Sequence, residues 1–170
     1  MPAPSRLSSA EVAAGAGDAA EVAAAGHRRA PSPRTFLSFD YGQRRVGVAV
    51  GNTVLAQAQA LQTVAAEGDA RLVALAALIA QWQPDALVVG VPFHPDGAAH
   101  EMTHQARRFA RQLRGRFGLP VHEVDERYTT TEAQAQGARG AAAGVDAVAA
   151  ALILDQFFRN LPPGAADAAA

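Results

Sequence analysis

The sequence predicts an α/β layer fold, in which helices pack on a mixed central sheet. Two neighbouring strands are expected at residues 35–40 and 46–51, because Phe and Val residues there flank a tight glycine turn. The short continuous apolar run at 86–90 is typical of a strand that is buried on both faces. Amphipathic segments before and after that run supply the helices.

Weaker signals place the remaining elements. A third strand is expected around 54–63, although its Ala and Gln content supports it poorly. Asp69 could cap a helix that ends before Pro84 and carries Trp82 into the core. Further helices are expected over about 105–117, ended by Gly118, and over 132–138 and 144–160, with a short strand at 121–124.

The two ends of the chain differ from the middle in composition. Residues 1–33 are rich in Ala, Gly, Pro and Ser, and they contain too few large apolar side chains to offset the entropy of ordering. We therefore expect a disordered tail at 1–33, one folded domain at 34–161 and a second tail at 162–170.

Composition also limits the kinds of function. The 170 residues include 49% apolar residues and no Cys, which excludes disulfides and thiolate metal sites. The net charge is −1, so any surface that binds nucleic acid must be local. No apolar stretch approaches the roughly 20 residues of a membrane span. We expect a cytoplasmic protein without a membrane partner.

Acidic side chains follow or begin several predicted elements. Asp40 ends the first strand, Asp125 and Glu126 end the strand at 121–124, and Asp146 begins the last helix. If the fold brings them together, their oxygens suit Mg²⁺ or Mn²⁺ and leave positions for phosphate and water. The alternatives are ordinary ones, a turn-forming Asp at a strand end and a first-turn Asp favoured by the helix dipole. The pattern indicates a small metal-dependent nuclease.

Arginine supplies every basic residue of the chain, and two groups of Arg could contact phosphate. Arg44 and Arg45 follow the turn at Gly42, where they could grip an anion or be exposed hairpin residues. The segment 105–118 carries five Arg and no acid, and helical spacing places Arg107 and Arg111 on one face together with Arg114. That face could line a groove for a phosphate backbone, or it could be a solvated surface.

Five segments in a fixed order resemble the YqgF family, whose members are described as Holliday junction resolvases or pre-16S rRNA nucleases. They run from Phe39-Asp40-Tyr41-Gly42 to Val50, from Val88-Val89-Gly90-Val91-Pro92 to Gly97, over 106–110, from Val124-Asp125-Glu126-Arg127 to Ala133, and from Val145-Asp146 to Leu154. Together they cover roughly residues 35–160.

The resemblance implies an RNase H-like fold with an acidic metal site. Asp40 matches the first-strand carboxylate, Glu126 with Asp125 matches the Asp-Glu-Arg motif, and Asp146 matches the acid of the last helix. By the same match, Arg127 and Arg45 would lie near the phosphate. We therefore expect two-metal hydrolysis with Mg²⁺ or Mn²⁺, acting on the 5′ end of pre-16S rRNA or on a branched DNA junction.

Two other classes remain as alternatives. ATP-handling proteins of the actin and sugar-kinase class also place an Asp-x-Gly turn between two strands, but they need a second domain that the sequence does not offer. A non-catalytic RNA- or ribosome-associated module would have the fold without turnover. The pair Phe157-Phe158 could support a homodimer, or it could belong to the core.

Overall fold

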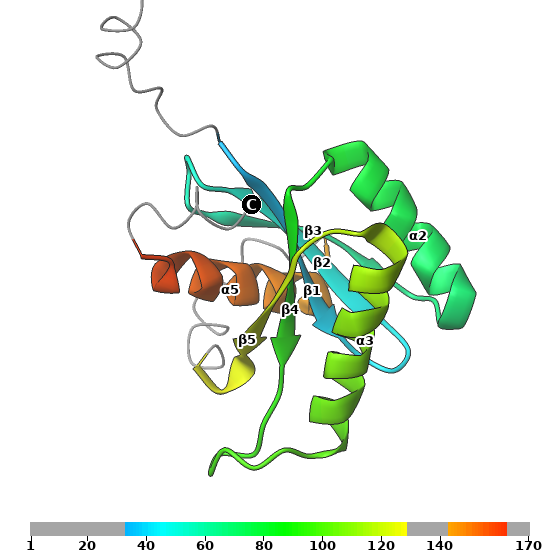
Figure 1. Ribbon diagram of the computed structural model, residues 1–170, viewed down its shortest axis with the longest axis vertical. Coiled ribbons are helices and arrows are strands. Elements are labelled where there is room, and N and C mark those ends of the chain that lie inside the picture. The colour runs from blue at the N-terminus through cyan, green and yellow to red at the C-terminus, as the bar shows by residue number, and fades with distance from the viewer. Residues whose placement is uncertain (1–32, 129–142, 163–170) are drawn as a thin grey trace, which may run out of the picture. The chain divides into compact units, whose positions relative to one another are not determined.

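The computed structural model describes residues 33–128 and 143–162, which form a five-stranded mixed sheet with helices on both faces (Figure 1). The strand order is β3-β2-β1-β4-β5. The first three strands pair antiparallel, and β4 and β5 run parallel to β1. The strands are β1 Thr35–Tyr41, β2 Val46–Asn52, β3 Ala58–Val64, β4 Ala86–Val91 and β5 Val121–Asp125.

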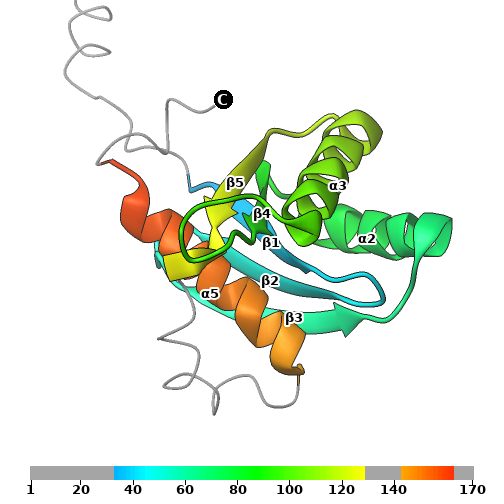
Figure 2. The ribbon, with the colours of Figure 1, turned by 90° about the horizontal axis from the view of Figure 1, so that it is seen from below.

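Helices cover the two faces of this sheet unequally. Figure 2 shows α5 (Val145–Asn160) on one side, and α2 (Gly68–Trp82) with α3 (Glu101–Phe117) on the other. A short 3-10 helix, Glu126–Tyr128, follows β5 directly. None of the helices within the described residues is long and apolar enough to span a membrane.

This architecture confirms the predicted α/β fold and most of its elements. The third strand begins later than expected, at Ala58, and Gly118 ends α3 in the left-handed conformation as predicted. Two details were wrong: Glu67 rather than Asp69 precedes α2, and Trp82 is 36% exposed at its end. The helix expected at 132–138 lies outside the described residues, and so do the tails expected at 1–33 and 162–170, except for residues 33 and 162.

The two faces of the sheet carry side chains of different size. Leu37 and Phe39 of β1 belong to the larger core under α2 and α3. On the opposite face, the buried Ser38 hydroxyl donates to the Ala150 carbonyl of α5 at 2.7 Å. The α5 face of β2 is small, because it presents Gly47 and Ala49 to the helix. Helix α5 can therefore lie closely against the sheet.

The rings of α5 pack inward rather than forming an exposed patch. Phe157 and Phe158 lie with their ring centroids 5.2 Å and 5.7 Å from that of Phe36 on β1. Both rings join the core cluster on this face of the sheet. Of the two interpretations that the sequence left open for this pair, the structure supports the core.

We predict that Gly47→Ala destabilises the protein by about 1–3 kcal/mol, because added core volume must be accommodated by shifting its surroundings. A Cβ at this position would lie 1.8 Å from the Asp146 carbonyl oxygen, so α5 would have to move away from β2. Thermal unfolding measures the loss. Gly115→Ala is the control, since a Cβ there meets nothing within 4 Å on helix α3. A Gly47→Ala protein as stable as the control would contradict this packing.

Candidate active site

Asp40 is the centre of the candidate site, and glycine stands beside it on both neighbouring strands. It pairs with Gly47 across the β1–β2 ladder. On the other side, the β1–β4 register aligns Phe39 with Val89, so the next step along the strands places Asp40 beside Gly90. Because neither neighbour has a side chain, the sheet leaves room over Asp40 on the face that α5 covers.

Glu126 uses the room over Gly90. A Cβ at Gly90 would lie 2.4 Å from Glu126 Oε1 and 2.4 Å from Ile153 Cδ1 of α5. The glycine thus lets the carboxyl group of Glu126 lie over the sheet, where its side chain hydrogen-bonds that of Asp40. This pair joins the end of β1 to the residue that follows β5.

The two carboxyl groups cannot both be ionised cheaply in this position. Burial, then the charges of Glu126 and Asp146, then the hydrogen bond to Glu126 raise the pKa of Asp40 from 3.8 to about 8. Burial also raises the pKa of Glu126, although the hydrogen bond from Asp40 acts in the opposite direction. Both shifts have the same direction, so burial of this pair favours the protonated form of its carboxyl groups.

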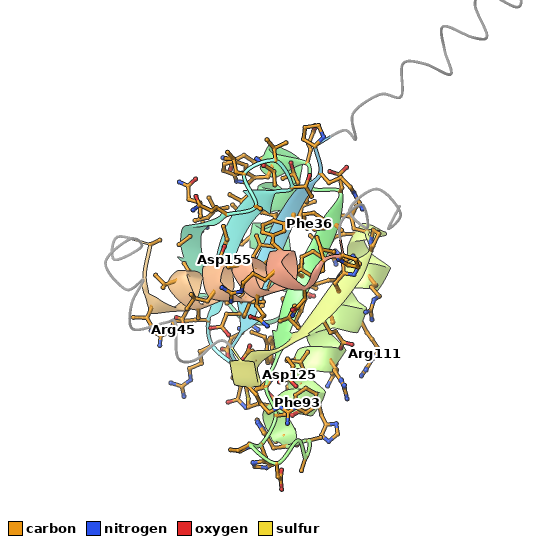
Figure 3. All side chains as sticks on the ribbon, turned by 90° about the vertical axis from the view of Figure 1, so that its left-hand side faces the viewer. Phe36, Arg45, Phe93, Arg111, Asp125 and Asp155 are labelled. Carbon is orange, nitrogen blue, oxygen red and sulfur yellow. The ribbon has the colours of Figure 1, made fainter. Side chains whose placement is uncertain are left out.

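Asp146 lies at the margin of this pair, in the first turn of α5. Its charge is one of the causes that raise the pKa of Asp40, and its Oδ2 lies 3.4 Å from Nε of Arg45. Gly144 leads into the helix with φ +94°, a conformation that disfavours any side chain. Figure 3 shows Arg45 beside the start of α5.

Asp125 is engaged differently from its neighbour Glu126. Its carboxylate accepts hydrogen bonds from Nε and Nη2 of Arg127 at 2.7–3.1 Å. These side-chain bonds are the main reason that the pKa of Asp125 is lowered. Two residues earlier on the same face of β5, Glu123 lies 3.7 Å from Arg107 of α3. The alternation of the strand thus turns Asp125 toward the α3 side, away from Asp40.

The predicted phosphate-binding arginines do not form one cluster. Arg45 meets Asp146, while Arg107 and Arg127 lie with Cζ 5.2 Å and 5.7 Å from the ring centroid of Phe93. Arg44 is exposed in the β1–β2 turn, and Arg111 is exposed on α3 (Figure 3). The structure therefore places three of the five near the carboxylates or Phe93, and two on open surface.

Comparison with known proteins agrees with this geometry. Residues 34–160 match the sequence model of the RuvX family, described as Holliday junction resolvase. The chain belongs to the RuvX family. This is the family also called YqgF, so the resemblance drawn from the sequence is confirmed.

Curated RuvX relatives match most of the chain. One from Albidiferax ferrireducens is 65% identical over 128 residues, covering 75% of this chain and 80% of the relative. One from Burkholderia pseudomallei is 56% identical over 131 residues, covering 75% and 90%. Both carry the name "Putative pre-16S rRNA nuclease".

A solved structure resembles the RuvX chain in fold. Thermus thermophilus RuvC in complex with a Holliday junction substrate matches with a TM-score of 0.50 and 16% sequence identity. The match covers 77% of this chain and 97% of RuvC. It confirms the RNase H-like fold of the RuvX chain.

The donor set of the RuvX site fits a hard divalent cation. Carboxylate oxygens are the ligands that Mg²⁺ and Mn²⁺ prefer. A cation would favour the ionised form of Asp40, which burial and the charges of Glu126 and Asp146 disfavour. Within residues 33–128 and 143–162, however, no three Asp, Glu or His side chains already converge on one point. Asp146 is turned to Arg45, and this pair would have to separate for all three acids to share an ion.

Two features of this site were not predicted from the sequence. Neither Gly47 nor Gly90 was linked to Asp40 from the sequence, whereas in the structure both clear space over it. Phe93 was assigned no role. The signal available in the sequence was positional, because Gly47 and Gly90 stand on the strands that neighbour Asp40.

The raised pKa of Asp40 predicts how the stability of the cation-free protein depends on pH. The unfolded chain loses this proton near pH 3.8, but the folded protein keeps it until about pH 8. Folding therefore binds a proton over this interval, and the free energy of unfolding falls as pH rises from about 4 to about 8. Asp40→Asn removes the part of this slope that Asp40 causes.

We expect Asp40→Asn to unfold at a higher temperature than wild type at pH 8 in the presence of a chelator, and at a similar temperature at pH 4. Each kcal/mol corresponds to about 2–4 °C in Tm at this chain length. Thermal unfolding across this pH range measures the difference. A variant that is less stable than wild type at pH 8 would contradict the raised pKa of Asp40.

Proposed function

We propose that this RuvX protein is a metal-dependent nuclease that processes the 5′ end of pre-16S rRNA. The observation that carries the proposal is the hydrogen-bonded pair Asp40–Glu126 at the end of the parallel strands, with Asp146 beside it. Such crowding of acids destabilises a protein and is common at sites that bind cations or perform acid–base chemistry. The names of the curated relatives support pre-16S rRNA as the substrate.

The proposed roles follow from where the side chains lie. Asp40 and Glu126 would hold Mg²⁺ or Mn²⁺, and Asp146 would complete the set once released from Arg45. When bound, the ion supplies an activated water and neutralises charge on the phosphate. Asp125 was expected as a further metal ligand, but its bonds to Arg127 favour another role, that of holding the guanidinium in place.

The arginines would act on the phosphate backbone. Arg45 is 65% exposed in its side chain and, once Asp146 turns to the cation, would be available to an incoming phosphate. Arg127 is oriented beside Glu126 and would approach the same part of the strand. Arg44, Arg107 and Arg111 would add contacts farther along the backbone, with the salt dependence that such contacts give.

Two expectations complete the proposal. A protein that matures ribosomal RNA would act in the cytoplasm, where that RNA is made. A homodimer stays a prediction, and it now lacks the Phe157-Phe158 patch that suggested it, because those rings pack on Phe36.

Cleavage tests the proposal directly. With Mg²⁺ or Mn²⁺, the protein should cut an RNA that carries the 5′ precursor end of 16S rRNA. Asp40→Asn should lower the rate by more than about a hundredfold, since even residues behind a metal's ligands are worth about 10–100-fold. Asp69→Asn, an exposed acid on α2, is the matched control and should cleave normally.

A four-way DNA junction belongs in the same assay, because the family description names that substrate. If the protein cuts the junction and not the RNA, its substrate is branched DNA. If neither substrate is cut although the RNA binds, the protein is an RNA-binding module and the proposal fails.

Cation binding can be measured without turnover. At a concentration of about 100 times the Kd, Mn²⁺ should stabilise the wild-type protein by about 2.7 kcal/mol, seen as a higher Tm. Asp40→Asn should lose most of this shift, while Asp125→Asn should keep it because Asp125 is assigned to Arg127. If both variants lose the Mn²⁺-dependent rise in Tm equally, Asp125 is a metal ligand after all.

A further inference from the structure

A cleft of about 300 Å³ opens beside Glu126, lined by Pro92, Phe93, Pro95, Glu126 and Arg127. We refer to it as the Phe93 cleft. Three of its five residues have apolar rings, one is a planar cation, and one is a carboxylate of the proposed active site. It lies on the segment that joins β4 to α3, next to the end of β5.

The cleft is built from groups that stack on flat rings. Nucleobases in unpaired RNA stack on aromatic side chains and on the planes of Arg guanidinium groups. Phe93 supplies an aromatic ring and Arg127 a guanidinium group. The Cζ atom of Arg127 lies 5.7 Å from the centroid of the Phe93 ring. The proline rings extend the apolar wall.

The walls of the cleft are held in position. Asp125 fixes the guanidinium of Arg127 at 2.7–3.1 Å. Gly97, with φ +92°, passes so close that an added Cβ would lie 3.0 Å from Arg127 Nη1. From α3, Arg107 lies over Phe93 and Thr103 donates a hydrogen bond to the Pro92 carbonyl. A cleft that is already ordered costs little entropy when a ligand enters.

We infer that the Phe93 cleft receives one unpaired nucleobase of the RNA strand, next to the phosphodiester at Asp40 and Glu126. This deepens the proposed function and rests on it. The volume suits a single nucleoside. A base inside a continuous duplex must first unstack and unpair, which costs a few kcal/mol. The cleft therefore favours a strand that is unpaired beside the cut over a continuous duplex.

A purely structural role for Phe93 is the competing explanation. The ring could serve only to hold Arg107 and Arg127 beside β5. In that case Phe93→Leu would weaken cleavage of every substrate by the same factor. If the ring stacks on a base, its loss should matter only when that base is present.

Cleavage of matched RNAs separates the two explanations. The substrate is a single-stranded RNA with either an intact or an abasic nucleotide at each position flanking the cut. On the intact RNA, Phe93→Leu should lower kcat/KM by about tenfold or more, and Phe93→Trp should retain most of it. On the RNA that lacks the stacked base, the kcat/KM of wild type should fall to that of Phe93→Leu. The kcat/KM of Phe93→Leu should be the same on both RNAs. Phe117→Leu on α3 is the matched control. Removal of the base should lower its kcat/KM by the same factor as that of wild type.

Binding without cleavage provides the second arm. An RNA with 2-aminopurine at the stacked position is mixed with Asp40→Asn protein, and binding should quench the fluorescence of the 2-aminopurine. The double variant Asp40→Asn, Phe93→Leu should leave this fluorescence unquenched. Quenching that does not depend on Phe93, or equal sensitivity of wild type and Phe93→Leu to the abasic nucleotide, would overturn the inference. If wild type cuts no RNA, the proposed function fails, and this binding arm still reports on the cleft.

Discussion

The structure depends on one close contact, in which Glu126 and the first turn of α5 approach Asp40 over two glycines. Gly47 and Gly90 stand on the strands on either side of Asp40, and a side chain on either would collide with Asp146 or Glu126. The acids come from three distant parts of the chain, so only the packed sheet can bring them together. The packing over these two glycines therefore determines both how α5 lies on the sheet and where the acids of the site are placed.

This contact has a cost that the fold tolerates. Burial of Asp40 beside Glu126 raises the pKa values of both, which means that the folded state works against their ionisation. Core packing of the large side chains on the opposite face, such as Phe39 against Phe109, supplies stability elsewhere. Carboxyl groups that are costly to ionise in the free protein and that a bound cation would stabilise in the ionised form are expected of a metal-dependent enzyme.

Much of the fold could be predicted from the sequence, because apolar periodicity reports directly on which residues face a core. Helix α3 followed from this periodicity, whereas the hairpin of β1 and β2 followed from Phe and Val content around a glycine turn, and strand β4 from a continuous apolar run. The third strand was displaced because Ala and Gln give little β signal, and Trp82 was misplaced because it ends its helix at the edge of the core.

The site was harder to predict, since it depends on contacts across the chain. The acids could be named from their motifs, but sequence order alone did not separate Asp125 from Glu126. The separation follows from the alternation along β5: Val124 packs with Phe36 on the α5 face, so Asp125 turns to the other. The close approach of Glu126 to Asp40 depends on the missing side chain of Gly90, which no local pattern reveals.

The charge of α3 is likewise less available than its sequence indicates. Arg107 is paired with Glu123, and Arg114 donates to the Val121 carbonyl at 2.8 Å. Part of the +5 charge of this segment therefore ties α3 to β5 and does not form a free basic surface. With a net charge of −1 on the whole chain, recognition is better explained by local contacts around the carboxylates than by a broad field.

The proposed cation site is tested most directly by anomalous diffraction at the manganese edge from crystals grown with Mn²⁺. We expect a peak bonded to carboxylate oxygens of Asp40 and Glu126, with Asp146 turned toward it from Arg45, and Asp125 still bound to Arg127. A peak at Asp125 with none at Asp40, or no peak among these acids at saturating Mn²⁺, would contradict it.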